Sequence, residues 1–137
     1  MARVLIVPCG CRGRELATRL RADGHAVRGT TRDPAHADAI AAAGAEPYVG
    51  DPDRIGTLMG ALAGVTVVVW LMGSIPIPAG RVRMLFEKLV DTPVRGVVYE
   101  GDAPEVARDA RERWRMPVEV LAPGDDEKAA VDRLLGL

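Results

Sequence analysis

The first third of the chain alternates short apolar runs with a glycine turn and a helical segment. Residues 3–8 (Arg-Val-Leu-Ile-Val-Pro) form an apolar run that suits a buried strand. Gly10 and Gly13 follow in a tight turn, residues 15–22 carry Leu and Ala at helical spacing, and residues 25–30 are a second strand-like run. In such a strand, turn, helix and strand, backbone N–H groups at the start of the helix face a ligand's pyrophosphate. The pattern therefore predicts a dinucleotide ligand.

The same alternation continues to the end of the chain. Further strands are expected at residues 46–49, 66–71, 96–99 and 117–121, and helices at residues 35–43, 54–63, 82–90, 104–114 and 125–135. Strands that alternate with helices are typical of a parallel sheet covered on both faces. We therefore predict an α/β fold: a three-layer, doubly wound Rossmann fold whose six-stranded parallel sheet has the order 3-2-1-4-5-6.

Length and composition restrict the classes of protein. The 137 residues fit one domain over residues 1–137, and the balanced charge (net −1) without a basic tract argues against a nucleic-acid partner. The longest apolar stretch, residues 65–72, is far shorter than the roughly 20 residues that cross a membrane. With no secretory signal near the start, a cytoplasmic location without membrane attachment is expected.

The two cysteines do not form a recognised metal or redox motif. Cys9 and Cys11 are separated by one residue rather than two, and the only histidines are His25 and His36. This set is a poor match to the ligand spacing of structural zinc sites. We therefore expect no metal and interpret each cysteine as a small residue in a tight turn.

Four segments, which together span about half of the chain, resemble a known family. They are residues 10–14 (Gly-Cys-Arg-Gly-Arg), 24–34 (Gly-His-Ala-Val-Arg-Gly-Thr-Thr-Arg-Asp-Pro), 50–53 (Gly-Asp-Pro-Asp) and 61–73 (Ala-Leu-Ala-Gly-Val-Thr-Val-Val-Val-Trp-Leu-Met-Gly). In these segments the chain resembles an atypical or extended short-chain dehydrogenase/reductase of the NmrA-like and NAD-dependent epimerase type, as a minimal single-domain member.

The resemblance implies a set of cofactor-binding residues. They are Gly10, Cys11, Arg12, Gly13, Thr31, Arg32, Asp51, Leu71, Met72 and Gly73. Gly10 and Gly13 match the second and third glycines of the family pattern Gly-x-x-Gly-x-x-Gly, and Arg14 the residue after it. Val7 stands in place of the first glycine, which normally lets the chain turn beneath the pyrophosphate. A bulky residue there could reshape the phosphate site.

The residues after the second strand bear on the choice of cofactor. An acidic residue at the position of Arg32 would bind both ribose hydroxyls and select NAD. Thr30, Thr31 and Arg32 instead offer hydroxyls and a guanidinium, which suit a 2′-phosphate. The resemblance thus implies NADP, with NAD as the alternative. Asp51 matches the family's contact to the adenine amino group, or else caps a helix. By the same resemblance, residues 71–73 contact the cofactor's ribose.

The catalytic residues of the family have no counterpart in this chain. Family dehydrogenases use a Tyr-x-x-x-Lys pair, in which the lysine lowers the pKa of the tyrosine. Neither Tyr48 nor Tyr99 has a lysine four residues later, and the sole serine, Ser74, suits a turn better than a nucleophile. The sequence therefore leaves the catalytic residues unknown, and with them whether the protein is an enzyme. Candidate cleft residues are residues 74–78, Tyr99, Glu100 and Asp102. Glu100 is interpreted as a solvated loop carboxylate, with an acid or base role as the alternative.

Three functions remain open, in order of preference. The first is a protein that holds NADP(H) as a sensor, regulator or subunit. The second is a small NAD(P)H-dependent reductase or epimerase-like enzyme that leaves proton transfer to water or substrate. The third is a structural relative whose altered turn no longer binds nucleotides. The sequence also leaves room for a small-molecule substrate, and for a homodimer formed through exposed helix faces near the last strand.

Overall fold

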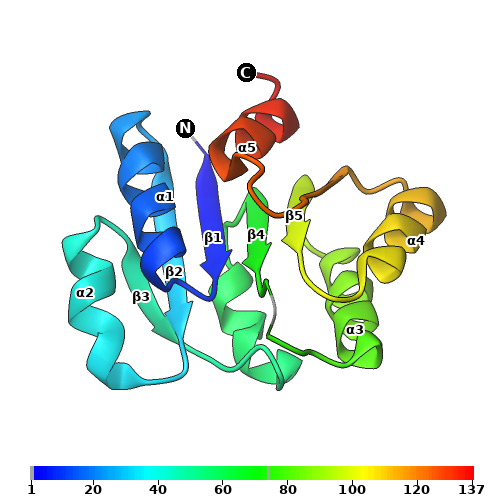
Figure 1. The fold of residues 1–137 in the computed structure, drawn as a ribbon, viewed down its shortest axis with the longest axis horizontal. Coiled ribbons are helices and arrows are strands. Elements are labelled where there is room, and N and C mark those ends of the chain that lie inside the picture. The colour runs from blue at the N-terminus through cyan, green and yellow to red at the C-terminus, as the bar shows by residue number, and fades with distance from the viewer. Residues whose placement is uncertain (1, 74) are drawn as a thin grey trace.

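The strands form one parallel sheet whose order reverses in the middle. The computed structural model describes residues 2–73 and 75–137. The strands are β1 Arg3–Val7, β2 Ala26–Thr31, β3 Glu46–Val49, β4 Val67–Leu71, β5 Gly96–Glu100 and β6 Val118–Val120. Their order is β3-β2-β1-β4-β5-β6 and every neighbouring pair is parallel (Figure 1). The predicted fold class and strand order are therefore confirmed.

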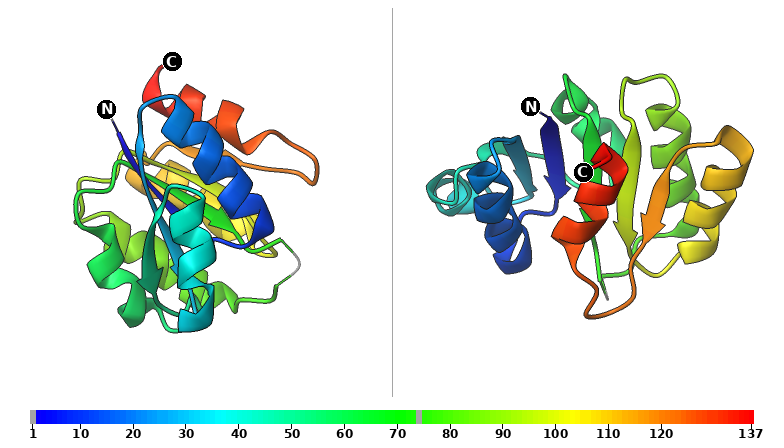
Figure 2. Two further views of the ribbon diagram at one scale, coloured as in Figure 1. Left: turned by 90° about the vertical axis from the view of Figure 1, so that its left-hand side faces the viewer. Right: turned by 90° about the horizontal axis from the view of Figure 1, so that it is seen from above.

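Helices cover both faces of this sheet. They are α1 Cys11–Ala22, α2 Ala37–Ala42, α3 Ala79–Leu89, α4 Pro104–Trp114 and α5 Glu127–Leu135, with two 3-10 segments, η1 Pro34–His36 and η2 Ile55–Leu62. α1, α2 and α5 lie on one face, whereas η2, α3 and α4 lie on the other (Figure 2). No helix within residues 2–73 and 75–137 combines the length and apolar character needed to cross a membrane.

Alternate residues of the central strands fill two separate cores. The core beneath α1 and α5 contains Val4, Ile6, Val67 and Val69. The core beneath η2 and α3 contains Leu5, Val7, Val68 and Trp70. Strands that are buried on both faces read as continuous apolar runs, which is why the sequence of β1 and β4 shows no polar alternation.

Several helical segments differ from the prediction: α3 begins at Ala79 rather than at residue 82, the helix expected over residues 35–43 is η1 followed by α2, and two more differ as follows. The helix expected over residues 15–22 begins at Cys11, so part of the expected turn is helical. A side chain at Gly13 would lie 3.0 Å from Ile6 Cγ2 and 3.1 Å from the Pro8 carbonyl, so a glycine there lets α1 pack closely on β1. The helix expected over residues 54–63 is the 3-10 segment η2. Gly60 of that segment lies directly against the Tyr48 hydroxyl, which leaves no room for a Cβ.

Candidate functional site: a cavity at the carboxyl edge of the sheet

A cavity of about 590 Å³ opens where β1, β2, β3 and β4 end. Its walls are residues 8–11 after β1, residues 30–33 at the end of β2, residues 50–53 after β3, and Met72 with residues 75–77 after β4. Open α/β sheets bind ligands in this place, outside the carboxyl ends of the strands and at the point where the strand order reverses. The volume also lies within the range of small-molecule and cofactor sites.

The turn after β1 presents an uncapped helix start to this cavity. Gly10 is the N-cap of α1, no side chain caps the helix, and its first turn contains no acidic residue. The first N–H groups of a helix have no intrahelical partners and attract anions. A Cβ at Gly10 would meet nothing within 4 Å, so the backbone there is open to a close-lying ligand. These properties fit a diphosphate.

Val7, which replaces the first glycine of the family pattern, does not enter the cavity. Its side chain is 1% exposed and packs in the core beneath η2 and α3. Pro8 instead forms part of the cavity wall. Cys9 N donates a hydrogen bond to the Thr30 carbonyl (2.8 Å), which ties the turn to β2. The substitution therefore leaves an opening in front of Gly10.

The end of β2 places two hydroxyl side chains at the cavity. Thr31 Oγ1 accepts a hydrogen bond from Asp33 N (3.1 Å). Thr30 is 1% exposed, and its Oγ1 has no hydrogen-bond partner among the residues that the structure describes. Thr30 lines the cavity, but its Oγ1 is itself buried, so this hydroxyl is not open to a ligand there.

Two arginines and a histidine also line this cavity. Arg32 and His36 are both exposed and line it together with the half-buried Arg14. Asp33 also lines it, but its Oδ1 accepts a hydrogen bond from Ala35 N (2.9 Å) and caps η1. Sequence reasoning selected Arg32 and missed His36. The position of His36, one short turn after β2, was the available signal.

The remaining walls are a polar turn and an apolar loop. Asp51 Oδ1 accepts a hydrogen bond from Asp53 N (2.9 Å), and Asp51 N donates to Thr57 Oγ1 (2.8 Å), so this carboxylate shapes the turn ahead of η2. Met72, Ile75 and Ile77 face it from the loop after β4. Ser74, another predicted cleft residue, lies outside the described residues. A ligand with one polar and one flat apolar part matches these walls.

Four of the predicted cofactor residues do not line the cavity. Leu71 is buried in the core beneath α1 and α5, and Gly13 forms the close contact of α1 with β1. A Cβ at Gly73 would lie 3.6 Å from Glu100 Oε1, on the side of β5. Arg12 belongs to the first turn of α1, but its side chain turns away from the cavity. The other predicted residues, Gly10, Cys11, Thr31, Arg32, Asp51 and Met72, line it together.

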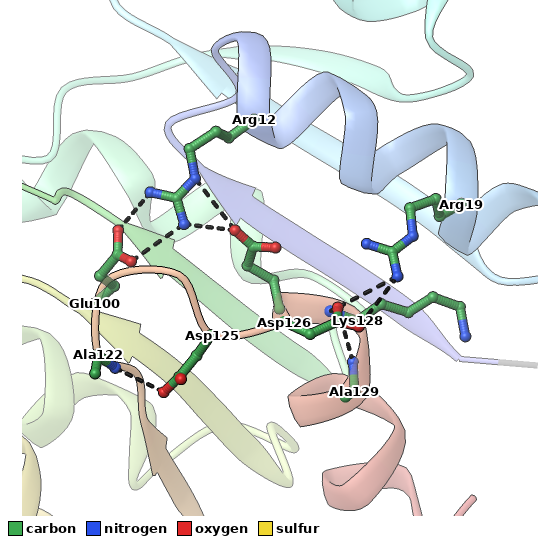
Figure 3. Close-up of polar contacts among 9 residues, drawn as sticks. Arg12, Arg19, Glu100, Ala122, Asp125, Asp126, Lys128 and Ala129 are labelled. Atoms are coloured by element: carbon green, nitrogen blue, oxygen red, sulfur yellow. Dashed lines mark hydrogen bonds and ion pairs between the residues drawn. The ribbon is translucent and has the colours of Figure 1, made fainter.

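Arg12 instead forms a two-pronged ion pair with Glu100 (Figure 3). Nη1 donates to Oε1 at 2.6 Å and Nη2 to Oε2 at 3.1 Å, while Nε donates to Glu127 Oε1 at 3.2 Å. Hydrogen bonding to Glu100 first, and to Glu127 second, raises the pKa of Arg12 above its ordinary value. Parallel N–H donors of this kind make the strongest carboxylate pairs.

The interpretation of Glu100 as a solvated loop carboxylate is wrong. Glu100 is the last residue of β5, and its side chain is only 9% exposed. Arg12, which is 88 positions away in the chain, supplies the charge that makes this burial tolerable. No local sequence pattern reveals a partner at that distance.

Tyr99 and Asp102 also lie outside the cavity. Tyr99 is fully buried, and its hydroxyl accepts a hydrogen bond from Ala103 N (3.0 Å) in the turn before α4. Burial raises the pKa of Tyr99, which keeps the phenol protonated. Asp102 lines a smaller hollow beside residues 76–79. The described part of the chain brings together no group of three His, Cys, Asp or Glu side chains that could hold a metal ion.

The two cysteines occupy different environments. Cys11 is exposed at the start of α1, whereas Cys9 is buried between α1 and β2. Desolvation raises the pKa of Cys9 to about 11, although the nearby Arg14 charge opposes the shift. Cys9 is therefore a protonated, unreactive thiol near neutral pH.

Comparison with known proteins agrees with this geometry. Residues 10–135 match the family described as NAD(P)H-binding. Among curated protein sequences, none matches the chain significantly. The fold is shared with the TrkA-N domain of the inner membrane protein ybaL from Escherichia coli, which is 13% identical (TM-score 0.63) over 98% of this chain and 94% of that chain.

Two larger solved structures share the fold. One is a short-chain dehydrogenase/reductase superfamily protein from Agrobacterium tumefaciens with bound NAD (22% identity, TM-score 0.57). The match covers 74% of this chain and 32% of that chain. The other is the NADPH-dependent quinone oxidoreductase QOR2 from Escherichia coli (21% identity, TM-score 0.55). The match covers 72% of this chain and 34% of that chain. The matched region is thus about a third of each of these proteins. By its family match and strand order, the chain belongs to the NAD(P)H-binding family, as a Rossmann-fold protein whose cofactor is a nicotinamide dinucleotide.

Proposed function

We propose that this protein binds NADP(H) in preference to NAD(H) and acts as a sensor, regulator or subunit. The observation that carries the proposal is that two guanidinium side chains, those of Arg14 and Arg32, line the cavity together with Thr31 and His36. A guanidinium pairs well with a phosphate, whereas NAD-binding sites place a carboxylate on the ribose hydroxyls. The nearest carboxylate in sequence, that of Asp33, already accepts a backbone hydrogen bond.

Under this proposal each wall of the cavity contacts one part of the cofactor. Backbone N–H groups near Gly10 and Cys11 bind the diphosphate, because they lie at the uncapped start of α1. Arg32, with Arg14, binds the 2′-phosphate. Asp51 approaches the adenine, and Met72 packs against the sugar.

The environment of the two tyrosines supports a binding role rather than proton transfer. Tyr99 is buried with its hydroxyl on a backbone N–H, and Tyr48 packs against Gly60 of η2. Neither is followed by a lysine at the spacing that would lower its pKa. Neither tyrosine lines the cavity, so neither phenol could donate a proton to a hydride acceptor bound there.

A second candidate is a small NAD(P)H-dependent reductase. The apolar wall formed by Met72, Ile75 and Ile77 favours it, because a flat acceptor such as a flavin or quinone could stack there. Such acceptors need little acid help. The NADPH-dependent quinone oxidoreductase that shares the fold is an analogy of this kind.

Calorimetric titration of the full chain with NADP⁺, NADPH, NAD⁺ and NADH tests the proposal. We expect NADP(H) to bind at least about tenfold more tightly than NAD(H), which corresponds to roughly 1.4 kcal/mol. Equal affinities would overturn the preference for NADP(H), and the absence of all binding would overturn the function. Steady-state NADPH oxidation with flavin, quinone and carbonyl acceptors separates the two roles, since turnover would favour the reductase.

A further inference from the structure

A second hollow lies at the edge of the sheet opposite the cofactor cavity. It is lined by Leu89 and Val90 at the end of α3, by residues 94–95 before β5, and by residues 114–117 between α4 and β6. Because neighbouring strands are parallel, this is the amino edge of the sheet, whereas the larger cavity opens at the carboxyl edge (Figure 1). A partner bound at this hollow would therefore leave the cavity free for a dinucleotide.

The size and lining of the hollow suit one side chain of another protein better than a whole small molecule. Its volume is about 210 Å³, below the roughly 300 Å³ at which ligand sites usually begin. Val90, Trp114 and Met116 give it apolar walls, and Val90 is 43% exposed. Tryptophan, methionine and arginine are residue types enriched at protein interfaces. The lining is therefore that of a place where a partner anchors an apolar side chain.

Two arginines also line the hollow. They are Arg95, just before β5, and Arg115, just after α4, and both are exposed. Neither guanidinium forms an ion pair with a residue that the structure describes. The acidic residues closest to the lining in sequence, Asp91 and Glu112, do not line the hollow. Positive charge beside apolar walls complements a partner that is acidic around an apolar side chain.

The backbone at Arg115 is a separate sign that its side chain has a role. Its φ is 51°, and within residues 2–73 and 75–137 it is the only residue other than glycine with a positive φ. A side chain in this conformation has a steric cost, which is why glycine usually follows a helix there. The left-handed residues after α1, α2, η2 and α5 are all glycines, namely Gly24, Gly44, Gly64 and Gly136. Exceptions to such local rules are concentrated at functional sites.

We propose that this hollow is a docking site for an acidic segment of a partner protein. The segment places one apolar side chain against Val90 and Trp114 and pairs its carboxylates with Arg95 and Arg115. A nucleic acid would also pair with the arginines, but it has no aliphatic side chain for the apolar walls. The inference goes beyond the proposed NADP(H) binding and does not depend on it, and it gives a regulator or subunit a surface for its partner.

Peptide titration followed by NMR tests the docking site. The isotope-labelled full chain is titrated with the end-blocked peptide Glu-Asp-Leu-Asp-Glu while its amide shifts are recorded. We expect a Kd of about 1 mM or tighter, with the largest shifts at residues 89–95 and 114–117. Replacing the leucine by glycine, or every acidic residue by lysine, should weaken binding at least about tenfold. No shift of these amides at about 10 mM peptide, or equal binding of the lysine peptide, overturns the proposal.

A pair of double variants tests the two arginines. Arg95→Gln combined with Arg115→Gly removes both guanidiniums, and because glycine adopts the left-handed conformation without strain, the Tm should not fall. We expect this variant to bind the acidic peptide at least about fivefold more weakly. Arg83→Gln combined with Arg108→Gln is the control, since it removes two exposed charges from α3 and α4 that do not line the hollow. Unchanged affinity in the first variant, or an equal loss in the control, overturns the proposal.

Two further results would assign the hollow to a different occupant. If a short oligothymidylate shifts the same amides at lower concentration than the acidic peptide does, the occupant is a nucleic acid. If sedimentation equilibrium shows a dimer that Arg95→Gln with Arg115→Gly dissociates, the occupant is a second copy of this chain. Either result overturns the acidic protein partner and leaves the proposed NADP(H) binding untouched.

Discussion

At the scale of single residues, side chains at the end of β2 have two different roles: some accept hydrogen bonds from the backbone, and others face the cavity. Thr31 Oγ1 and Asp33 Oδ1 each accept a hydrogen bond from a nearby backbone N–H. Arg32, which lies between them, is exposed and lines the cavity, so its guanidinium can contact a phosphate there. Selection between the two cofactors is therefore expected to depend on Arg32 more than on its neighbours.

Arg32→Ala should weaken NADP⁺ and leave NAD⁺ almost unaffected. Loss of a charge-assisted hydrogen bond costs about 1.5–3 kcal/mol, which is a factor of roughly 10 to 150 in Kd. Calorimetric titration of both cofactors measures the difference. Arg108→Ala is a matched control, because Arg108 is exposed on α4 and does not line the cavity. Equal losses for NADP⁺ and NAD⁺ would show that Arg32 does not contact the 2′-phosphate.

Gly29→Ala should destabilise the fold through one contact. The new Cβ would lie 2.6 Å from both Cβ and Sγ of Cys9, and 3.2 Å from Ile40 Cγ2. Such overpacking costs about 1–3 kcal/mol, which thermal unfolding would detect as a lower Tm. Adding Cys9→Gly should restore most of the loss. Gly80→Ala in α3 is the control, because a Cβ there meets nothing within 4 Å and its Tm should not fall.

At the scale of elements, α5 is attached to α1 by groups that titrate at acid pH. Asp126 caps α5 by accepting hydrogen bonds from Lys128 N (3.0 Å) and Ala129 N (3.4 Å). The bond from Ala129 is the largest of the causes that lower the pKa of Asp126. Lys128 bonds Asp23 at the end of α1 (2.6 Å), which lowers the pKa of Asp23.

The stability of the α1–α5 contact should therefore fall in acid. A carboxyl group with a lowered folded-state pKa stabilises the protein above its unfolded value, here 3.8, and loses this contribution as the pH drops through the folded value. We expect the Tm advantage of the wild type over Asp126→Asn, which keeps a capping side chain, to shrink as the pH falls from about 4 to about 2. A constant difference across that range would show that the charge of Asp126 does not contribute. Thermal unfolding of both proteins at a series of pH values measures this difference in Tm.

The sequence predicts the elements well where periodicity decides them. The strands and their order follow from apolar runs such as residues 3–8 and 66–71, because a buried parallel strand needs no other signal. The start of α1 and the 3-10 form of η2 did not follow. Both segments contain a glycine in a close tertiary approach, Gly13 to Ile6 and Gly60 to Tyr48, and such approaches have no local sequence pattern.

The candidate site divides in the same way. Motif residues with short-range roles, such as Gly10 and Arg32, line the cavity, and their contact with a cofactor stays a prediction. Arg12 and Glu100 were misplaced because their pairing spans 88 positions, and ion pairs between distant segments leave no trace in spacing or composition. His36 was missed because a lone histidine after a strand has many explanations.

At the scale of the whole molecule, the two halves of the sheet are tied together away from the cavity. Arg28 of β2 is buried, and its Nη1 donates to the carbonyls of Ala61 (2.6 Å) and Ala63 (3.0 Å) at the end of η2. η2 leads into β4, so this arginine links the β1–β3 half to the chain that enters the other half. A cavity between halves held in this way should change little in shape when a ligand binds.

NADPH should therefore raise the Tm of the entire fold as one transition. A ligand at about 100 times its Kd adds roughly 2.7 kcal/mol to the free energy of unfolding, which is several degrees for a chain of this size. Scanning calorimetry at rising NADPH concentration measures it. Two separate transitions, or no shift at a saturating concentration, would contradict a preformed site. The homodimer, the small-molecule substrate, the single-domain organisation and the cytoplasmic location stay predictions.

The unobstructed position of Gly10 has a practical consequence for experiments in cells. Its φ of −83° is one that L-residues adopt, and an added side chain would project into open space, where we propose that the diphosphate binds, rather than into the protein. Gly10→Val should consequently yield a normally abundant yet cofactor-blind protein. Cells that carry this variant can be compared with a strain in which the gene is deleted. A defect shared by both strains depends on cofactor binding, whereas a defect seen only in the deletion strain depends on the presence of the protein without its cofactor.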